Sequence, residues 1–386
     1  MKRLALSAAL AVVCIPVFAE DPKTAAEFVE RGAKKAKAGD RDGAIEDYTQ
    51  ALALDPKHVD ALMKRGNAWY AKKDWAKSAA DYGEVLKLDG KNAKARLYRG
   101  DALYNAEDYD GALADYDAAV AADPKSAIAV RSRGEVKFWK ADYAGAVADF
   151  DKAAGLNPKD ARALTYRGRA KRADGRFAEA LEDFTMAIQL DKRASLAWHG
   201  RGECRIAIGD RKGAIADFDE ALKLDAGNPE FFESRAIALA DDGQPDPALA
   251  DARQALKRYK PGSLRDAMAA RIWTLSARLE GREAAKKELA DYLRTRKAGD
   301  DGPALAIAKF LADQSSEAEV FKAAEAAKTP GASCAAWFYV GIRRLVDGDQ
   351  ATAKRYLQKS IDLGKSGEPE ARSAALEMAK LADGGK

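Results

Sequence analysis

The sequence predicts an all-α solenoid of stacked antiparallel helix pairs, followed by an irregular helical C-terminal part and a capping helix. Three observations predict this fold class. The chain of 386 residues contains a pattern that returns every 34 residues. Within each copy, apolar residues recur with the period of an amphipathic helix. The composition, 47% hydrophobic and 33% charged, is that of a globular protein.

Composition also excludes several function classes. The 65 basic and 61 acidic residues leave a net charge of +4, without the concentrated basic excess of a nucleic-acid binder. Two His and three Cys offer few ligands for a zinc or haem site. No phosphate-binding glycine motif and no nucleophile–base pair is visible. We therefore predict no catalytic residue, no cofactor, no metal and no nucleic-acid partner.

The first nineteen residues have the layout of a secretory signal peptide. A basic start at Met1–Arg3 precedes an apolar run over Leu4–Phe18 and a small residue at Ala19. The run is too short to span a bilayer. We predict cleavage after Ala19 and a mature chain that is periplasmic or secreted. We favour this over the alternative that the first nineteen residues form an N-terminal helix of the mature fold. We do not expect lipidation at Cys14, because no small residue directly precedes it. No later segment reaches transmembrane length.

The repeat shows most clearly in four aligned positions. Each copy has an arginine, a small residue next to it, a second small residue twelve positions later and, in six copies, an aromatic ring sixteen positions after the first small residue. The arginines are Arg31, Arg65, Arg99, Arg133, Arg167, Arg201 and Arg235. The rings are Tyr48, Tyr82, Tyr116, Phe150, Phe184 and Phe218, and Ala252 takes this position in the last copy.

These positions resemble the signature of the tetratricopeptide repeat over residues 25–262, as seven repeats of 34 residues. The resemblance implies two antiparallel helices per repeat and a right-handed superhelix with a concave, ligand-binding groove. The residues of one copy agree. Leu97, Gly100 and Tyr104 share one helical face, Tyr116 lies on a second helix, and Pro124 closes the repeat. The small glycine allows close approach of the two helices and leaves space for the tyrosine ring.

The signature weakens over residues 263–331, where we predict degenerate helix pairs. One pair surrounds Gly281 within residues 264–298, and a further helix covers 303–313. Ser316 and Glu319 form the pattern of a capping box at the start of the next helix. We predict a loop over residues 329–331.

Residues 334–386 are predicted to form a repeat-like pair near 334–347 and 350–363, covered by a C-terminal capping helix near 369–382. Trp337, Gly341 and Ala353 have repeat spacing. This end of the chain is similar to that of bacterial envelope tetratricopeptide lipoproteins, which act as adaptors for periplasmic peptidases. A disulfide between Cys204 and Cys334 is compatible with export, but their wide separation favours two buried thiols.

Aspartates also repeat at the 34-residue period, sixteen positions after each arginine. In an antiparallel helix pair, the arginine and the aspartate lie at the same level along the helix axes. One interpretation is a charged ladder that binds an extended polymer. The interpretation that we favour is a structural Arg–Asp pair inside each repeat, because identical residues in every copy suit packing better than selective recognition.

The resemblance implies that the first helix of each repeat lines the groove. Carried onto this sequence, the candidate partner-binding residues are Asn67, Tyr70, Asp101, Tyr104, Asn105, Arg131, Phe138, Trp139, Arg162, Arg169 and Arg172. The middle of this set is aromatic and its end is basic, which suits a peptide with apolar side chains and an acidic stretch. In the alternative interpretation, Phe138 and Trp139 pack between repeats and the arginines are solvated.

We therefore predict a non-enzymatic scaffold or adaptor of the bacterial cell envelope, which binds a protein or extended peptide in its groove. A binding protein for an anionic envelope polymer or glycan is the alternative. The sequence names neither the partner nor the oligomeric state.

Overall fold

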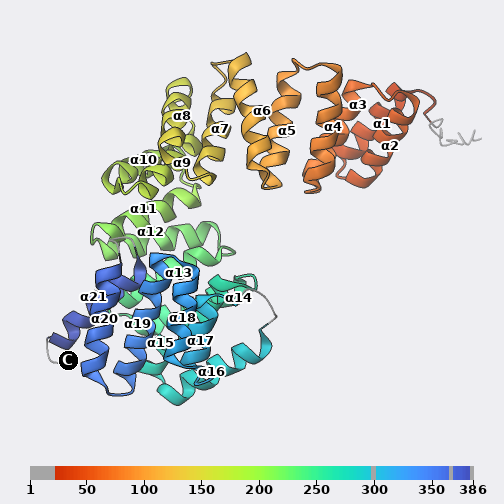
Figure 1. The fold of residues 1–386 in the computed structure, drawn as a ribbon. Helices are drawn as coiled ribbons and strands as arrows, with labels where there is room; N and C mark the ends of the chain where they lie inside the picture. The colour runs from red at the N-terminus through yellow and green to blue at the C-terminus, as the bar shows by residue number, and fades with distance from the viewer. Residues whose placement is uncertain (1–21, 297–300, 365–367, 383–386) are drawn as a thin grey trace, which may run out of the picture. The chain divides into compact units, whose positions relative to one another are not determined.

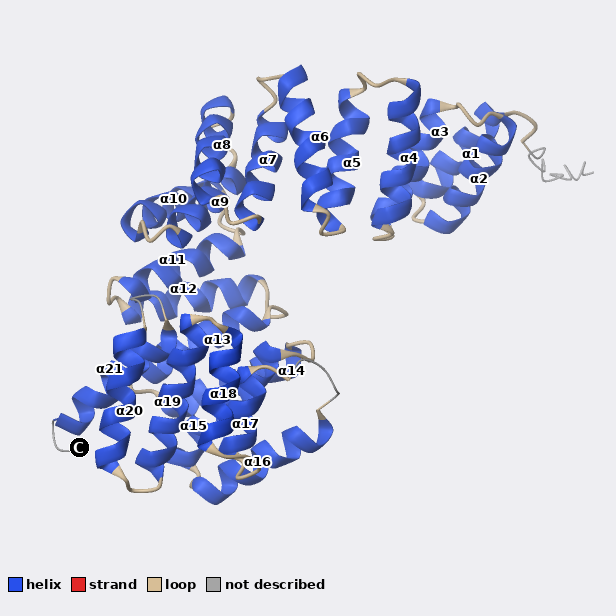
Figure 2. Cartoon of the chain, in the orientation of Figure 1, coloured by secondary structure: helices blue, strands red, loops and turns tan. Residues whose placement is uncertain are grey.

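The computed structural model describes residues 22–296, 301–364 and 368–382 (Figure 1). These residues form 21 α-helices and no strand (Figure 2), which confirms the all-α prediction. The chain divides into two compact units, Met1–Lys140 (unit 1) and Ala141–Lys386 (unit 2). The predicted signal peptide, residues 1–19, lies outside the described residues.

Helices α1 to α14 occupy the region of the 34-residue pattern. They are α1 (Ala25–Lys37), α2 (Arg41–Leu54), α3 (Val59–Ala71), α4 (Trp75–Leu88), α5 (Ala93–Asn105), α6 (Tyr109–Ala122), α7 (Ala127–Trp139), α8 (Tyr143–Leu156), α9 (Ala161–Ala173), α10 (Phe177–Leu190), α11 (Ser195–Ala207), α12 (Arg211–Leu224), α13 (Pro229–Asp241) and α14 (Pro245–Arg258).

Helices α15 to α21 form the remainder of unit 2. They are α15 (Ser263–Leu279), α16 (Arg282–Thr295), α17 (Pro303–Leu311), α18 (Glu317–Ala327), α19 (Pro330–Val346), α20 (Gln350–Leu363) and α21 (Pro369–Ala382).

A short link joins the two helices of each repeat, and in the first repeat Asp40 bonds to both of them. After α1, the amide of Gly39 donates to the carbonyl of Ala36 at 3.1 Å and that of Asp40 to Lys35 at 3.0 Å. These two bonds make a Schellman motif, which ends a helix. The carboxylate of Asp40 then accepts from the amide of Gly43 at 2.9 Å and caps α2. The chain thus reverses within three residues.

The turn needs a left-handed backbone conformation at one position, which recurs every 34 residues. Four copies place glycine there, but three do not. The residues at this turn position, all with positive φ, are Gly39, Lys73, Glu107, Ala141, Gly175, Gly209 and Gly243. The left-handed conformation is about 1–2 kcal/mol less favourable for a residue with a Cβ. Three of the turns therefore adopt a conformation that their residue type disfavours.

In five repeats the glycine of the first helix lies directly against the ring of the second helix. A Cβ on Gly100 would lie 2.8 Å from Cε1 of Tyr116, closer than van der Waals contact allows. Tyr116 is 1% exposed and belongs to the core. This confirms the prediction that the small residue makes room for the ring.

The predicted Arg–Asp pairs form inside the repeats. Arg65 shows the geometry: its Nε and Nη2 donate to the two carboxylate oxygens of Asp81 at 2.9 and 2.7 Å. The same pairing occurs for Arg31–Asp47, Arg99–Asp115, Arg167–Asp183, Arg201–Asp217 and Arg235–Asp251. The aspartates of these pairs are buried. Each pair therefore serves the fold, as the structural interpretation predicted.

Three of these arginines, Arg65, Arg167 and Arg235, also bond to the preceding repeat. Arg235 donates through Nη1 to Asp219 at 2.6 Å, and Arg65 donates to Thr49 at 3.2 Å. One guanidinium thus joins the two helices of its own repeat and the second helix of the repeat before it.

The C-terminal helices share one buried hydrophobic core with residues from each of α15 to α21, and it includes Trp273, which is 1% exposed. The capping box of Ser316 and Glu319 forms as predicted. The loop predicted over residues 329–331 is wrong: Thr329 caps α19, and Pro330 is its first residue. Proline is well suited to that position because the first helical amide needs no partner.

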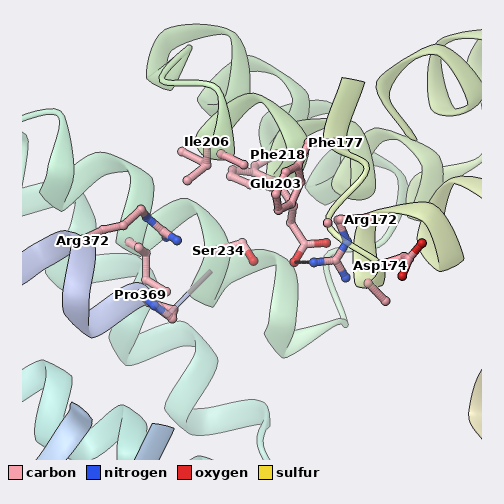
Figure 3. Close-up of a pocket in the computed structure, with 13 residues that line it drawn as sticks. Arg172, Asp174, Phe177, Glu203, Ile206, Phe218, Ser234, Pro369 and Arg372 are labelled. Atoms are coloured by element: carbon pink, nitrogen blue, oxygen red, sulfur yellow. Dashed lines mark hydrogen bonds and ion pairs between the residues drawn. The ribbon is translucent and has the colours of Figure 1, made fainter. Parts of the chain in front are cut away.

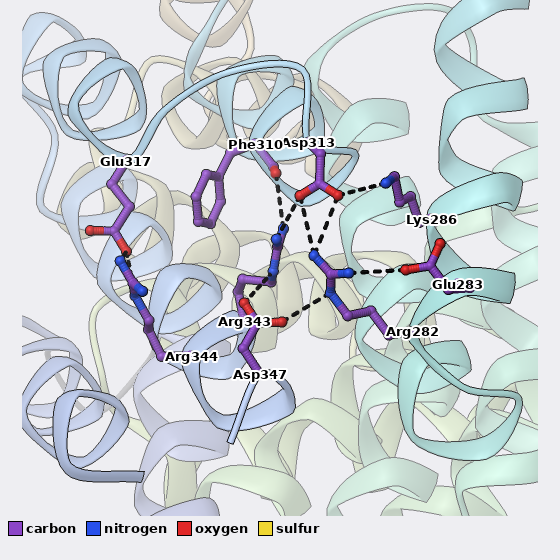
Figure 4. Close-up of polar contacts among 9 residues, drawn as sticks. All are labelled: Arg282, Glu283, Lys286, Phe310, Asp313, Glu317, Arg343, Arg344 and Asp347. Carbon is purple, nitrogen blue, oxygen red and sulfur yellow. Dashed lines mark hydrogen bonds and ion pairs between the residues drawn. The ribbon is translucent and has the colours of Figure 1, made fainter. Parts of the chain in front are cut away.

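A charge network joins α16, α19 and the end of α17 (Figure 4). Asp313 accepts from Lys286 at 2.8 Å and from Arg343 at 2.5 Å. Arg282 contacts Asp347 at 2.9 Å, and Arg343 contacts the same carboxylate at 2.8 Å. Burial would raise the pKa of Asp313, but the bonds from Lys286 and Arg343 outweigh burial and lower it.

Helix α21 covers α13 and α15 through contacts between residues that are distant in sequence. Arg271 of α15 donates to Glu370 at 3.0 Å. Ser373 of α21 donates to Asp241, at the end of α13, at 3.3 Å. The helix predicted near 369–382 therefore forms and closes this face of unit 2.

Candidate partner-binding site

The first helices of successive repeats contact one another as well as their own partners. In unit 1, α1 contacts α3 and α5 contacts α7; in unit 2, α9 contacts α11 and α11 contacts α13. We call the surface that these helices share within a unit its first-helix face. The eleven predicted binding residues fall on both faces, from Asn67 to Trp139 in unit 1 and from Arg162 to Arg172 in unit 2.

Two of the predicted binding residues form hydrogen bonds with tyrosine hydroxyls of the core. Asn67 accepts a hydrogen bond from the hydroxyl of Tyr82 at 2.7 Å, and Asp101 accepts from Tyr116 at 2.6 Å. Burial and the charge of Asp101 raise the pKa of Tyr116. Both phenols therefore stay protonated and donate.

A signal in the sequence could have revealed this role. The residue after the glycine is a short acceptor where the ring is Tyr82 or Tyr116. Where the ring is phenylalanine, the corresponding residues are the longer Glu135, Arg169 and Glu203. In these two repeats the acceptor satisfies a buried phenol, which a phenyl ring would not require. Beside Tyr48 the same position is Ala33, so the first repeat lacks this signal.

The aromatic candidates of unit 1 form a row that crosses the repeats. The side-chain amide of Asn105 donates to the hydroxyl of Tyr70 at 2.9 Å. One repeat later, Nε1 of Trp139 donates to the hydroxyl of Tyr104 at 2.6 Å. The structure thus brings together Tyr70 with Asn105 and Tyr104 with Trp139, each pair joining two consecutive first helices.

Trp139 remains at the surface even with this bond. It is 46% exposed, whereas aromatic rings at the repeat core are almost fully buried. Phe138 packs edge-to-face against it with ring centroids 5.5 Å apart. The interpretation that these rings pack between repeats therefore holds in part: Trp139 is anchored by Tyr104 and still presents a large apolar surface.

Arg131 is held within its own helix. Its Nη1 donates to Glu135 at 2.7 Å, and the two side chains are only 14% and 4% exposed. The positive charge is thus largely neutralised before any partner arrives.

The basic candidates of unit 2 have different environments. The guanidinium carbons of Arg162 and Arg169 lie 5.6 and 5.1 Å from the ring centroid of Tyr166, within reach of cation–π attraction. Arg172 instead donates to Glu203 of α11 at 3.1 Å. Arg162 is exposed, and the other two are partly buried.

Glu203 belongs to a polar row with His199 and Ser234, of which only the contact to Ser234 was not expected from the sequence. Nε2 of His199 lies 2.9 Å from the hydroxyl of Ser234, and its Nδ1 lies 3.5 Å from Glu203. Burial lowers the pKa of His199. The order resembles a Ser–His–acid triad, but Ser234 lies inside α13, where amides bond along the helix and none is left for an oxyanion. We assign the row a structural role.

A cavity of about 510 Å³ opens next to this row in unit 2 (Figure 3). Arg172 and Glu203 line one side, Ser234 lies between, and Pro369 and Arg372 of α21 line the other side. Apolar walls come from Phe177, Ile206, Phe218 and Ile237. Sequence reasoning singled out Arg172 but not Arg372, because nothing local indicates where α21 docks.

Several other features bear on function. Among the described residues no cluster of His, Cys, Asp and Glu is suited to hold a metal ion. No helix of the described ranges is long and apolar enough to cross a membrane. Cys204 and Cys334 are buried, free thiols, which agrees with the favoured prediction. His58 caps α3, because its Nδ1 accepts a hydrogen bond from the amide of Ala61.

A tetratricopeptide-repeat model matches residues 32–86, 74–127, 133–195 and 167–229. These matches together cover half of the chain, and the helix pairs, glycine–ring contacts and short turns described above provide the structural basis for them. The chain therefore belongs to the tetratricopeptide-repeat family, whose fold supports protein-interaction scaffolds that are generally non-catalytic.

Two solved structures that align with this chain are the following. A tetratricopeptide-repeat protein from Parabacteroides merdae aligns with a TM-score of 0.55 and 19% identity, over 63% of this chain and 96% of its own. PilF of Pseudomonas aeruginosa aligns with a TM-score of 0.46 and 20% identity, over 53% and 93% of the two chains. These likenesses concern the fold. No curated protein matches significantly in sequence.

Proposed function

We propose that this chain is a non-enzymatic scaffold of the bacterial cell envelope, which binds a protein or extended peptide on its first-helix faces. The observation that carries the proposal is the aromatic row of unit 1, in which Trp139 is held by Tyr104 and remains 46% exposed. An oriented tryptophan with a large exposed surface is a common energetic anchor of protein interfaces.

Export is the part of the proposal supported by the N-terminal sequence. The basic start, the apolar run and Ala19 favour a cleaved signal peptide. Sequencing the amino terminus of the protein recovered from cells tests this directly. A mature chain that begins at Glu20 is expected, and a chain that retains residues 1–19 would contradict envelope export through a cleaved signal.

Partner binding is tested with the mature chain as bait on an envelope extract. We expect the variant Trp139→Ala to retain at least about tenfold less of the captured protein. Leu88→Ala is the matched control, because Leu88 is 42% exposed in the same unit and lies on the second helix α4. Circular dichroism establishes that both variants remain folded. Equal retention by both variants would contradict a site on the first-helix face of unit 1.

The alternative, an anionic polymer or glycan as ligand, draws support from Arg162 and Arg169, which flank Tyr166. It is weakened by Arg172, whose charge is engaged by Glu203. Steep loss of binding with added salt would favour the polymer, because screening weakens exposed charge interactions. Weak salt dependence with loss in Trp139→Ala would favour the protein partner.

A further inference from the structure

Helix α21 presents two different faces to the rest of unit 2. Ala374, Met378 and Leu381 recur at spacings of four and three residues, and they pack against the core that α19 and α20 share. Glu370 and Glu377 lie on the adjoining face, and both pair with arginines of α15. Helix α21 is therefore amphipathic, with an apolar seam on one side and acidic side chains beside it.

The acidic face of α21 is aligned with α15 in a fixed register. Arg271 donates to Glu370 at 3.0 Å, and Arg278 donates to Glu377 at 2.9 Å. Both pairs join residues that are 99 positions apart, so the two helices run in parallel. Seven residues are nearly two turns of helix, which places both charges of each helix on one side. Charges that flank an apolar seam in this way set the choice and orientation of a partner helix.

A third polar contact joins the same face of α21 to α13. Ser373 lies between the two glutamates, and its hydroxyl donates to Asp241 at 3.3 Å. Helix α21 thus meets α13 and α15 through polar groups at three places, in addition to its apolar contact with the core. A surface that carries paired charges favours a helix with the complementary charges over one that lacks them.

Two cavities remain along α21. One of about 260 Å³ lies between α21 and helices α13, α14, α15 and α19, and Ser373 and Glu377 line it. Another of about 250 Å³ is lined mainly by apolar residues of α15, α17 and α19 and extends to Glu370. Closely packed helices leave few voids larger than a water molecule. There is therefore room beside α15 for larger side chains than α21 places there.

We propose that the surface of α13, α15, α19 and α20 that α21 covers, here named the α21-binding surface, is a docking site for an amphipathic helix of a partner protein. The partner helix carries two acidic residues seven positions apart, which pair with Arg271 and Arg278, and an apolar seam beside them. Helix α21 occupies the site until that helix replaces it. An amphipathic helix laid against an apolar surface is a common mode of peptide recognition. The proposal rests on the proposed function, because it specifies the chemistry of one segment of the partner.

The test measures binding of fluorescent peptides to full-length mature chains. The probe peptide has the sequence of residues 368–382, and a second peptide has Gln in place of the glutamates at 370 and 377. The chain Glu370→Arg, Glu377→Arg faces α15 with like charges, which releases its own α21. We expect this chain to bind the probe at least about tenfold more tightly than the native chain does, because α21 no longer competes. It should also bind the probe at least about tenfold more tightly than the Gln peptide.

The matched control is the chain Glu182→Arg, Glu325→Arg. It changes the net charge by the same amount at two exposed residues of unit 2, on α10 and α18. This chain should bind the probe as the native chain does. Circular dichroism establishes that each chain keeps its helices, and hydrogen exchange establishes that α21 is released only where its glutamates are reversed.

A second chain tests the pairing itself. Arg271→Glu, Arg278→Glu reverses the charges of the α21-binding surface, so its own α21 is again repelled. We expect it to bind a peptide with Arg at both glutamate positions and to reject the probe. This reversal of preference requires that the two arginines contact the two acidic positions of the bound helix.

Several results would overturn the docking site. They are equal binding of the probe by the native and the charge-reversed chains, equal affinity for the probe and the Gln peptide, or an unchanged preference in Arg271→Glu, Arg278→Glu. Unfolding of both charge-reversed chains would do the same, because α21 would then be an inseparable part of the core. A dimer of the native chain that Glu370→Arg, Glu377→Arg abolishes would assign the surface to α21 of a second copy instead of a partner.

The outcome is separable from that of the proposed function, because the α21-binding surface and Trp139 belong to different units. An envelope partner that depends on Trp139, together with no binding of the probe, would reject the docking site and keep the scaffold. Binding of the probe as expected, with no effect of Trp139→Ala on any partner, would keep the docking site and reject the site in unit 1.

Discussion

The repeat array and the C-terminal part of unit 2 both contain partly buried ion pairs, but the pairs span very different lengths of chain. Arg65 meets Asp81 16 residues later, and the same spacing returns in other repeats. Arg271 meets Glu370 and Arg278 meets Glu377 across 99 residues. The array is thus determined within each repeat and its neighbours, whereas α21 in the C-terminal part is held to α15 by pairs that lie far apart in sequence.

This difference predicts how far the loss of one ion pair destabilises the rest of the chain. In an array of repeats, stability is approximately a sum of repeat and nearest-neighbour terms, so losing one pair weakens its own repeat and the adjoining interfaces. In the C-terminal part, loss of one ion pair between α15 and α21 releases α21 from residues that are distant in sequence. Four predictions test or refine this comparison, from the largest effect to the smallest.

The largest effect is expected for Arg65→Leu, which leaves the carboxylate of Asp81 buried without this guanidinium. Removal of one member of a buried pair typically costs roughly 3–5 kcal/mol, and replacement of both by apolar residues is often neutral. The double variant Arg65→Leu, Asp81→Leu should recover most of the loss. Urea unfolding measures both. A double variant no more stable than the single one would show that the pair is not the source of the cost.

Arg271→Met should act locally. It leaves Glu370 without its partner where the two side chains are only 12% and 16% exposed, and we expect a loss of about 3 kcal/mol. Hydrogen exchange should rise across residues 369–382 while the helices of unit 1 keep their protection. Uniform loss of protection in both units would contradict a locally held α21.

Glu107→Gly tests the cost of the left-handed turn. Glu107 has φ of 64° in the link between α5 and α6, where glycine has no Cβ to strain. A gain of about 0.5–1 kcal/mol is expected from thermal melting. The reverse substitution at the equivalent turn, Gly209→Ala, should lose a similar amount. Changes of the same sign in both variants would exclude the backbone explanation.

The smallest effect concerns pH. Burial lowers the pKa of His199 below its ordinary value of 6.5; Glu203 and Glu230 act against this and Arg172 and Arg169 add to it. The unfolded chain therefore binds a proton at this histidine more readily than the folded chain does. The contribution of neutral His199 to stability is thus full above pH 6.5, and it is lost as the pH falls from 6.5 through the lower pKa of the folded state. Urea midpoints should decrease from pH 7 to 5, with a smaller slope in His199→Gln. Equal slopes would contradict a buried neutral histidine.

Much of the array could be predicted because its determinants are local. The spacing of Arg65 and Asp81 predicted their contact, and the small residue at Gly100 predicted the place of the Tyr116 ring. The turns were harder: Lys73, Glu107 and Ala141 adopt positive φ although nothing in those residue types favours it. Tertiary packing of the two helices imposes the conformation there.

The candidate site was predictable in part. Tyr70, Tyr104 and Trp139 were chosen for their place on the first helices, and they do form one row. Asn67 and Asp101 were assigned to the partner, although each also satisfies a tyrosine hydroxyl. The division of the chain into seven repeats, degenerate pairs and a terminal repeat-like segment stays a prediction.

The sequence by itself determined the helix pairs and the charged pairs within the repeats, because these depend on residues fewer than 34 positions apart. Only the tertiary structure placed Arg372 across a cavity from Arg172 and joined Arg271 to Glu370. Such contacts depend on where a distant helix docks. Docking is decided by the shape and charge of a whole surface, which no local pattern encodes.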